Sequence, residues 1–225
     1  MREALERDLR DLSAEFVRMI SLNLEQLSLA SKVLLEREID KIDMVHEIER
    51  RVDELELKLE AECLKIIARH QPVAGDLRLI AAILKSLSDL ERVGDYAVHV
   101  ADDARLLAAE PPLKRYINLS QMITRLKSML EAASFAFVQR DASSAHQAAQ
   151  VDLEIDDLYE QIQRELVTYM IEDPRTITKA LALLRVGRSL QRIGDHVENV
   201  LERVQYWVTG ERIASDAISG SESPA

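Results

Sequence analysis

Apolar residues recur every three or four positions along most of this chain, which is the spacing of one face of an α-helix. In the first 35 residues the stripe consists of Leu5, Leu9, Leu12, Phe16, Met19, Ile20, Leu27 and Ala30. The next stripe consists of Ile42, Val45, Ile48, Val52, Leu55, Leu59, Cys63 and Ile66. The whole pattern predicts six long helices, at about residues 2–35, 40–70, 76–107, 114–139, 143–171 and 174–208.

Helix-breaking residues divide the pattern into two halves. The double proline at 111–112 is the best candidate boundary, because proline disfavours a helical conformation in the residue before it. We therefore predict one three-helix unit over residues 1–110 and a second over residues 111–209. From residue 210 the chain is small and polar, so we expect residues 210–225 to form a disordered tail.

A short motif occurs once in each half. Residues 90–95 read LERVGD and residues 190–195 read LQRIGD, 100 residues apart. Residues 48–55 align in the same way with 151–158, at an offset of 103. This internal repeat predicts an all-α fold of two pseudo-symmetric three-helix bundles, with six long antiparallel helices. A glycine inside a helix costs ~1 kcal/mol relative to alanine, so we expect Gly94 and Gly194 to let a partner helix or a metal approach closely.

Composition and charge exclude several classes of protein. Gly (6), Pro (5) and aromatic residues (4%) are scarce, which favours helices over sheets. The net charge of −11 argues against nucleic acid as a direct partner. One cysteine, Cys63, excludes an internal disulfide and fits a packed core thiol. No apolar run approaches the ~20 residues that span a bilayer, so we expect a soluble, cytoplasmic protein.

Pairs of acids spaced four residues apart recur on the predicted second and third helices of each half. Such pairs lie about 40° apart on a helix, and like charges at this spacing repel. The pairs border the apolar stripes and consist of Glu49 and Asp53, Glu91 and Asp95, and Asp152 and Asp156, with Gln191 and Asp195 as the fourth pair. They could form a solvated edge paired with arginines. Alternatively, they could form an oxygen-rich cage for a cation such as Mg²⁺, Mn²⁺, Fe or Zn²⁺.

Four further residues are possible additional ligands by position: His99, Asp102, Gln191 and Asn199. The Glu-x-x-His signature of di-iron bundles is absent, as are phosphate-binding and dinucleotide-binding glycine loops. Three functions stay open on the residues alone. They are a metal-dependent regulatory protein, a carboxylate-bridged metalloenzyme and a metal-free helical scaffold.

The motifs resemble those of the PhoU family, the accessory proteins of phosphate-specific transport systems. The resemblance covers nearly the whole chain except the tail, and its most specific segments are residues 67–78, 87–95, 154–159, 169–174 and 189–196. It implies a cytoplasmic negative regulator of phosphate uptake and of phosphate-starvation signalling. It also implies contact with the ATPase subunit of the Pst phosphate transporter and with a PhoR-type sensor histidine kinase. Membrane association would then be peripheral, through these partners, and we expect a homodimer.

Some members of the family carry multinuclear metal clusters on paired acids. The resemblance maps these ligands to Glu49, Asp53, Glu91, Asp95, Asp152, Asp156 and Asp195. Gln191 departs from the pattern, because the family usually has an acid there. A neutral amide can ligate through its oxygen but adds no charge. We therefore expect the second site to bind metal more weakly than the first.

Overall fold

The computed structural model describes residues 2–211, and this part of the chain is built from helices, with no strand. The long helices are α1 (Arg2–Glu36), α2 (Ile42–His70), α3 (Ala74–Ala108), α4 (Ile117–Gln139), α6 (Val151–Glu172) and α7 (Ile177–Thr209). The short ones are η1 (Ile39–Lys41), α5 (Ala142–Ala149) and η2 (Pro174–Thr176). The predicted all-α fold is confirmed. Among the described helices, none combines the length and apolar character needed to cross a bilayer.

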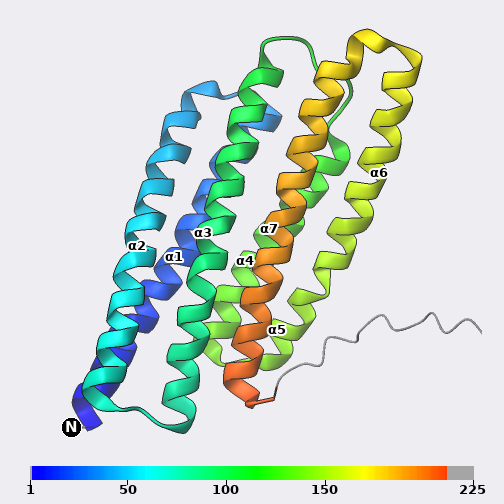
Figure 1. Ribbon diagram of the computed structural model, residues 1–225. Coiled ribbons are helices and arrows are strands. Elements are labelled where there is room, and N and C mark those ends of the chain that lie inside the picture. Colours follow the sequence, from blue (N-terminus) through cyan, green and yellow to red (C-terminus); the bar gives the residue numbers. More distant parts are fainter. Residues whose placement is uncertain (1, 212–225) are drawn as a thin grey trace, which may run out of the picture.

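The six long helices run side by side in two layers. Figure 1 shows α2, α3, α7 and α6 in one layer, with α1 and α4 behind it. Helix α1 packs against α2 and α3, and α4 packs against α6 and α7, so each half is a three-helix bundle, as predicted. The halves meet where α3 packs along α7 and where α1 contacts α4. The predicted division at residue 110 falls in the connection between α3 and α4.

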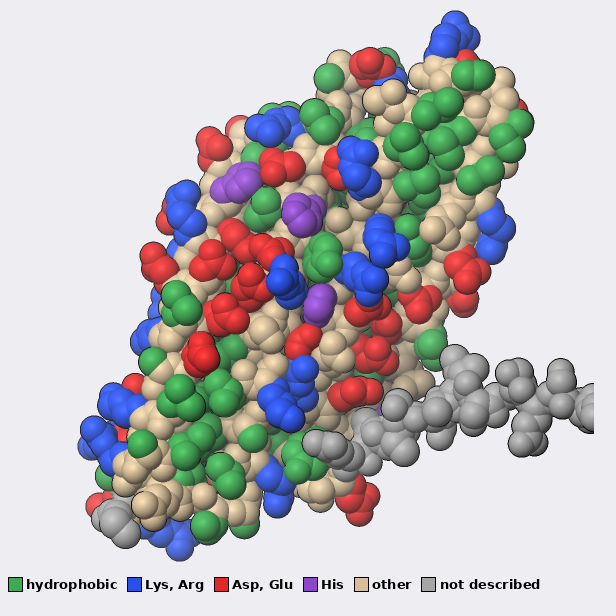
Figure 2. All heavy atoms as spheres, viewed as in Figure 1, with side chains coloured by type: hydrophobic (Ala, Val, Ile, Leu, Met, Phe, Trp, Pro, Cys, Tyr) green, Lys and Arg blue, Asp and Glu red, His purple; other side chains and the backbone are tan. Residues whose placement is uncertain are grey.

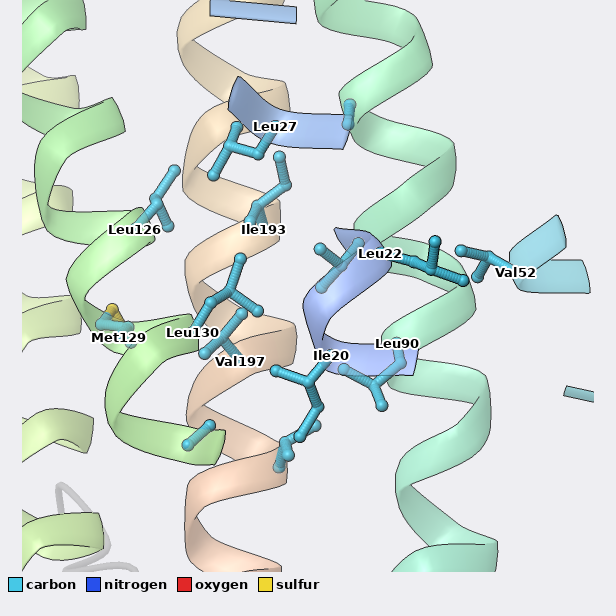
Figure 3. Packing of buried hydrophobic residues seen from close by; sticks show 14 of the residues in the cluster. Ile20, Leu22, Leu27, Val52, Leu90, Leu126, Met129, Leu130, Ile193 and Val197 are labelled. Carbon is cyan, nitrogen blue, oxygen red and sulfur yellow. The ribbon is translucent and has the colours of Figure 1, made fainter. Parts of the chain in front are cut away.

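One hydrophobic core runs through both halves. Figure 3 shows Ile20 of α1, Leu130 of α4, Val197 of α7 and Leu90 of α3 directed toward the same space. The buried positions repeat with the sequence offset: those of α1 from Phe16 to Leu34 mostly recur 103 residues later in α4, and those of α3 recur 100 residues later in α7. The internal repeat is therefore a repeat of packing as well as of motifs. Cys63 is fully buried in this core, and burial raises the pKa of its thiol to about 12, which makes it unreactive.

Local sequence signals explain two of the helix ends but do not explain a bend in the second half. The Asp141 carboxylate accepts hydrogen bonds from the backbone N–H groups of Ser143 and Ser144, at 3.0 and 3.1 Å, and thereby caps α5. Gly210 ends α7 at φ 76°, a conformation that favours glycine. The continuous helix predicted over 143–171 is wrong, because the chain bends at Gln150 between α5 and α6. No glycine or proline marks that bend. The predicted tail, apart from its first two residues, lies outside the described residues.

Candidate metal centres

The two motif glycines lie where an acid from the neighbouring helix enters the interface. A methyl group on Gly94 of α3 would overlap the carboxylate of Glu49 from α2. A methyl group on Gly194 of α7 would overlap the carboxylate of Asp152 from α6. The glycines thus permit the close approach of a neighbouring helix, as the motif predicted. They do so for an acid in both halves, which accounts for two helix-interior glycines.

The four acids predicted in the first half lie together between α2 and α3. Glu49 is the most strongly perturbed: burial, followed by the charges of Asp53, Asp95 and Glu91, raises its pKa to about 7. A hydrogen bond from Gln26 on α1 opposes this shift, since its amide nitrogen donates to Glu49 Oε2 at 2.5 Å. The other oxygen, Oε1, is buried without a hydrogen-bond partner. We call Glu49, Asp53, Glu91 and Asp95 the first acid cluster.

The second half brings its acids closer together. Asp152, Asp156 and Asp195 each offer a carboxylate oxygen, and these three oxygens lie within 4.8 Å of one another. Asp152 is only 6% exposed, and burial raises its pKa to about 7, with Glu198, Asp195 and Asp156 adding to the shift. Its Oδ1 atom is buried without a partner. These three residues, with Glu198, form what we call the second acid cluster.

The clusters differ in their neutral neighbours. Gln191 occupies the place of Glu91 and donates from Nε2 to Asp156 Oδ1 at 2.6 Å. A second difference concerns the buried acid. Met129 of α4 takes the place of Gln26 in the repeat, so the second half has no matching amide beside Asp152. Asp152 therefore lacks the hydrogen bond that Glu49 receives. The two differences therefore act in opposite directions on cation binding: Gln191 removes a charge from the second cluster, whereas the missing amide leaves its buried acid without a donor.

Glu198 was missed from the sequence as a site residue. Burial is the main cause of its raised pKa, and the charges of Glu202, Asp195 and Asp156 raise the pKa further. Its equivalent in the first half is Val98, so the repeat offered no signal. The available signal was the spacing 191, 195, 198 and 202, which places four polar residues on one face of a helix. Glu198 restores in the second cluster the charge that Gln191 removes.

Three of the possible additional ligands lie elsewhere. His99 and Asp102 line a groove between α3 and α7, and Asp102 Oδ1 lies 3.4 Å from Nε2 of His46. Asn199 is engaged across the interface between the halves, where its Nδ2 donates to Asp89 Oδ1 at 3.1 Å. The structure thus brings the acids and Gln191 into two clusters and places these three residues in other contacts.

Asp89 is a second buried acid that sequence reasoning did not single out. It lies on α3, is 6% exposed and receives hydrogen bonds from three residues of α7: His196, Asn199 and Arg203. Burial alone would raise its pKa, but these hydrogen bonds and the charge of Arg203 lower the pKa below its ordinary value. Asp89 is therefore a charged, fully partnered group that joins the two halves, in contrast to Asp152.

The chemistry of the clusters fits a hard or borderline cation. Carboxylate oxygens are the ligands that such ions prefer, and a bound ion would favour the ionised form of each acid. Asp152 Oδ1 and Glu49 Oε1 are buried oxygens without donors, and both lie among like charges. Buried carboxylates without partners are costly, and a cation is the partner that would satisfy both oxygens.

Comparison with known proteins covers both halves. The family model described as the PhoU domain matches residues 16–104 and 119–204. A relative from Deinococcus radiodurans, named as a phosphate-specific transport system accessory protein PhoU homolog, is 57% identical over 94% of this chain and 100% of its own. The accessory protein PhoU of Escherichia coli (strain K12) is 32% identical over 91% of this chain and 85% of its own.

Solved structures agree with the fold. The crystal structure of PhoU from Pseudomonas aeruginosa superposes with a TM-score of 0.88 at 38% identity, covering 92% of this chain and 99% of that one. The phosphate transport system regulatory protein PhoU from Streptococcus pneumoniae gives 0.85 at 28% identity, covering 93% and 99%. The resemblance seen in the motifs is confirmed over most of the chain. This chain therefore belongs to the PhoU family, whose relatives named above are accessory or regulatory proteins of phosphate transport systems.

Proposed function

We propose that this protein is a negative regulator of phosphate uptake and of phosphate-starvation signalling. In this proposal it acts in the cytoplasm, as a homodimer, and as an adaptor between the ATPase subunit of a phosphate transporter and a sensor histidine kinase. The relatives' names support the link to phosphate transport, and the similarity extends through both halves of the chain. The same names, accessory and regulatory protein, favour control by binding over catalysis.

We further propose that the adaptor is metal-dependent. This step rests on Glu49 and Asp152, which are equivalent in the repeat, because each has one buried carboxylate oxygen without a hydrogen-bond partner. A bound Fe, Zn, Mn or Mg ion would offset the repulsion among the acids and add positive charge to this face. The residues that would hold it are Glu49, Asp53, Glu91 and Asp95 in the first cluster, and Asp152, Asp156 and Asp195 in the second.

A complementation experiment tests the regulatory role. A strain lacking the protein should express a phosphate-starvation reporter even in phosphate-rich medium, and the wild-type chain should restore repression. The double variant Glu49→Gln, Asp152→Asn removes one buried charge from each cluster and should restore repression only in part. Asp157→Asn, on the exposed side of α6, is the matched control and should behave as wild type.

Physical contact is tested separately by co-purification of the tagged protein with the transporter ATPase subunit and with the kinase. Retention of either partner supports the adaptor role. Failure to retain both, together with normal repression in the deletion strain, would contradict the proposed function.

A further inference from the structure

The interface between α3 and α7 is pseudo-symmetric. The two helices are equivalent at an offset of 100 residues, and Figure 1 shows them running side by side through the centre of the molecule. Tyr96 and His196 occupy equivalent positions, and their rings stack across the interface with centroids 5.8 Å apart. The residues on one side of this ring pair therefore have sequence equivalents on the other side.

On one side, the buried carboxylate of Asp89 fills the interface and is held by His196, Asn199 and Arg203. On the other side, the equivalent of Asp89 is Ser189, which has a shorter side chain and no charge. The equivalents of His196 and Asn199 are Tyr96 and His99. The equivalent of Arg203 is Asp103, which pairs with Arg185 of α7. This half of the interface therefore has its carboxylate at position 103 and none at position 189.

The surface is hollowed beside Ser189. A groove of about 660 Å³ lies here, lined by Tyr96, His99 and Ser189, among others. Ser189 is 7% exposed, and within residues 2–211 its hydroxyl makes no hydrogen bond. The buried hydroxyl of Ser86, by contrast, donates to the carbonyl oxygen of Ala82 at 2.8 Å. The groove therefore contains a hydroxyl donor that makes no hydrogen bond within the described part of the chain.

The groove is also basic, on a chain whose net charge is −11. Four arginines line it against two acids, and one of the four, Arg192, is paired with Asp195 at 2.8 Å. Arg185 neutralises Asp103 at 2.5 Å, and Arg105 lies 3.5 Å from Asp102. Arg188 has no acidic partner among the described residues. Figure 2 shows Lys, Arg and His side chains along the middle of this face, with acidic side chains to either side.

We propose that this groove binds a small oxyanion of the phosphate class, with its oxygens in the space that corresponds to the Asp89 carboxylate. Arg188 would supply a guanidinium fork, which matches the geometry of phosphate oxygens. The Ser189 hydroxyl would donate one further hydrogen bond from the floor of the groove. The site needs no metal, so it goes beyond the proposed regulatory function and does not depend on the acid clusters.

Titration calorimetry at constant ionic strength tests the proposal, with inorganic phosphate as the probe and a chelator present. Wild-type protein should bind phosphate. Arg188→Gln should weaken binding about tenfold, because one charge-assisted hydrogen-bonding partner is lost. Ser189→Asp should abolish binding, since it places a carboxylate where Asp89 has one in the other half. Arg164→Gln, an exposed arginine on α6, is the control and should leave the affinity unchanged.

A second arm with ATP distinguishes the source of the phosphate group. Tighter binding of ATP that is lost in the same two variants would assign the groove to the phosphate of a nucleotide, and also supports the proposal. Circular dichroism checks that each variant is folded. The proposal is overturned if neither probe binds the wild type at up to about 10 mM. It is also overturned if phosphate binds only when the chelator is left out, because phosphate would then be held by cations, or if Arg188→Gln binds phosphate as tightly as wild type. Neither result bears on whether the protein contacts the transporter or the kinase.

Discussion

The carboxylate of Asp152 lies directly against Gly194, so that a methyl group at position 194 would overlap one of its oxygens. The same relationship joins Glu49 to Gly94 in the other half. In both halves, a glycine in the helix interior gives a buried acid the room it occupies. A substitution of the glycine should therefore displace the acid, so that the role of each cluster can be tested without changing the acid itself.

Gly194→Ala should weaken cation binding while leaving the free energy of unfolding nearly unchanged. The added methyl group must displace the end of the Asp152 side chain, which weakens cation binding by about tenfold or more. The cost to folding is offset by a gain of ~1 kcal/mol in helix propensity. We expect an unfolding free energy within about 1 kcal/mol of wild type, measured by urea denaturation with chelator present.

Gly75→Ala is the matched control, because a methyl group there meets no atom within 4 Å. It should leave the cation affinity unchanged. Equal cation affinity in Gly194→Ala and wild type would show that the position of Asp152 is irrelevant to binding.

Asp152→Asn should stabilise the metal-free protein at alkaline pH. Burial raises the pKa of Asp152 to about 7 from its ordinary value of 3.8, so the folded state holds this proton longer than the unfolded state does. The stability it contributes is complete below about pH 4 and is lost as the pH rises through about 7. At pH 8 we expect a gain of about 2 kcal/mol, roughly half of what the full shift corresponds to, because water entry relieves part of the cost.

Urea denaturation of both proteins, with chelator, at pH 5 and pH 8 measures this effect. The gain should be markedly smaller at pH 5. A gain of the same size at both pH values would mean that the substitution acts through packing, and not through the charge of Asp152.

The second cluster should fill with cation before the first. Its three carboxylate oxygens already lie within 4.8 Å of one another, and its buried acid lacks the hydrogen bond that Gln26 gives Glu49. After titration with substoichiometric Mn²⁺, metal analysis should show that Asp195→Ala loses more bound Mn²⁺, relative to wild type, than Asp95→Ala does. A larger loss in Asp95→Ala would restore the ordering expected from Gln191.

Asp89→Ala should be the most destabilising of these substitutions. It leaves Arg203 and His196 at the interface without their acceptor, and breaking a buried ion pair on one side costs about 3–5 kcal/mol. Thermal and urea denaturation measure the loss. Asp157→Ala, on the exposed side of α6, should stay within about 0.5 kcal/mol of wild type. A similarly small loss in Asp89→Ala would show that the network does not hold the halves together.

Periodicity was enough to predict the helices, because each half buries one continuous stripe per helix. The recurring acid pairs left open whether they form a solvated edge or a cage between neighbouring helices, and in the structure the charges of Glu91 and Asp95 act on Glu49. The bend at Gln150 was not predictable by the same reasoning. Its backbone stays near helical values, at φ −65° and ψ −16°, and no breaking residue marks it.

The contacts between the two halves could not be predicted from the sequence either. Asp89 stands beside the motif, yet its partners lie more than 100 residues away on α7, and no spacing rule connects them. Glu198 was missed for a related reason, because its equivalent, Val98, is apolar. Each of these acids occurs in one repeat only, so a search for features that the two repeats share does not find it.

The central claim is that the two acid clusters hold cations. Elemental analysis of protein purified without chelator tests it most directly, with wild type, Asp152→Asn and the double variant Glu49→Gln, Asp152→Asn prepared in parallel. We predict a transition metal or magnesium at a fixed ratio to wild-type protein, less in the single variant and almost none in the double variant. Wild-type protein that contains no metal and takes up none on titration, or the same metal content in all three proteins, would contradict the claim.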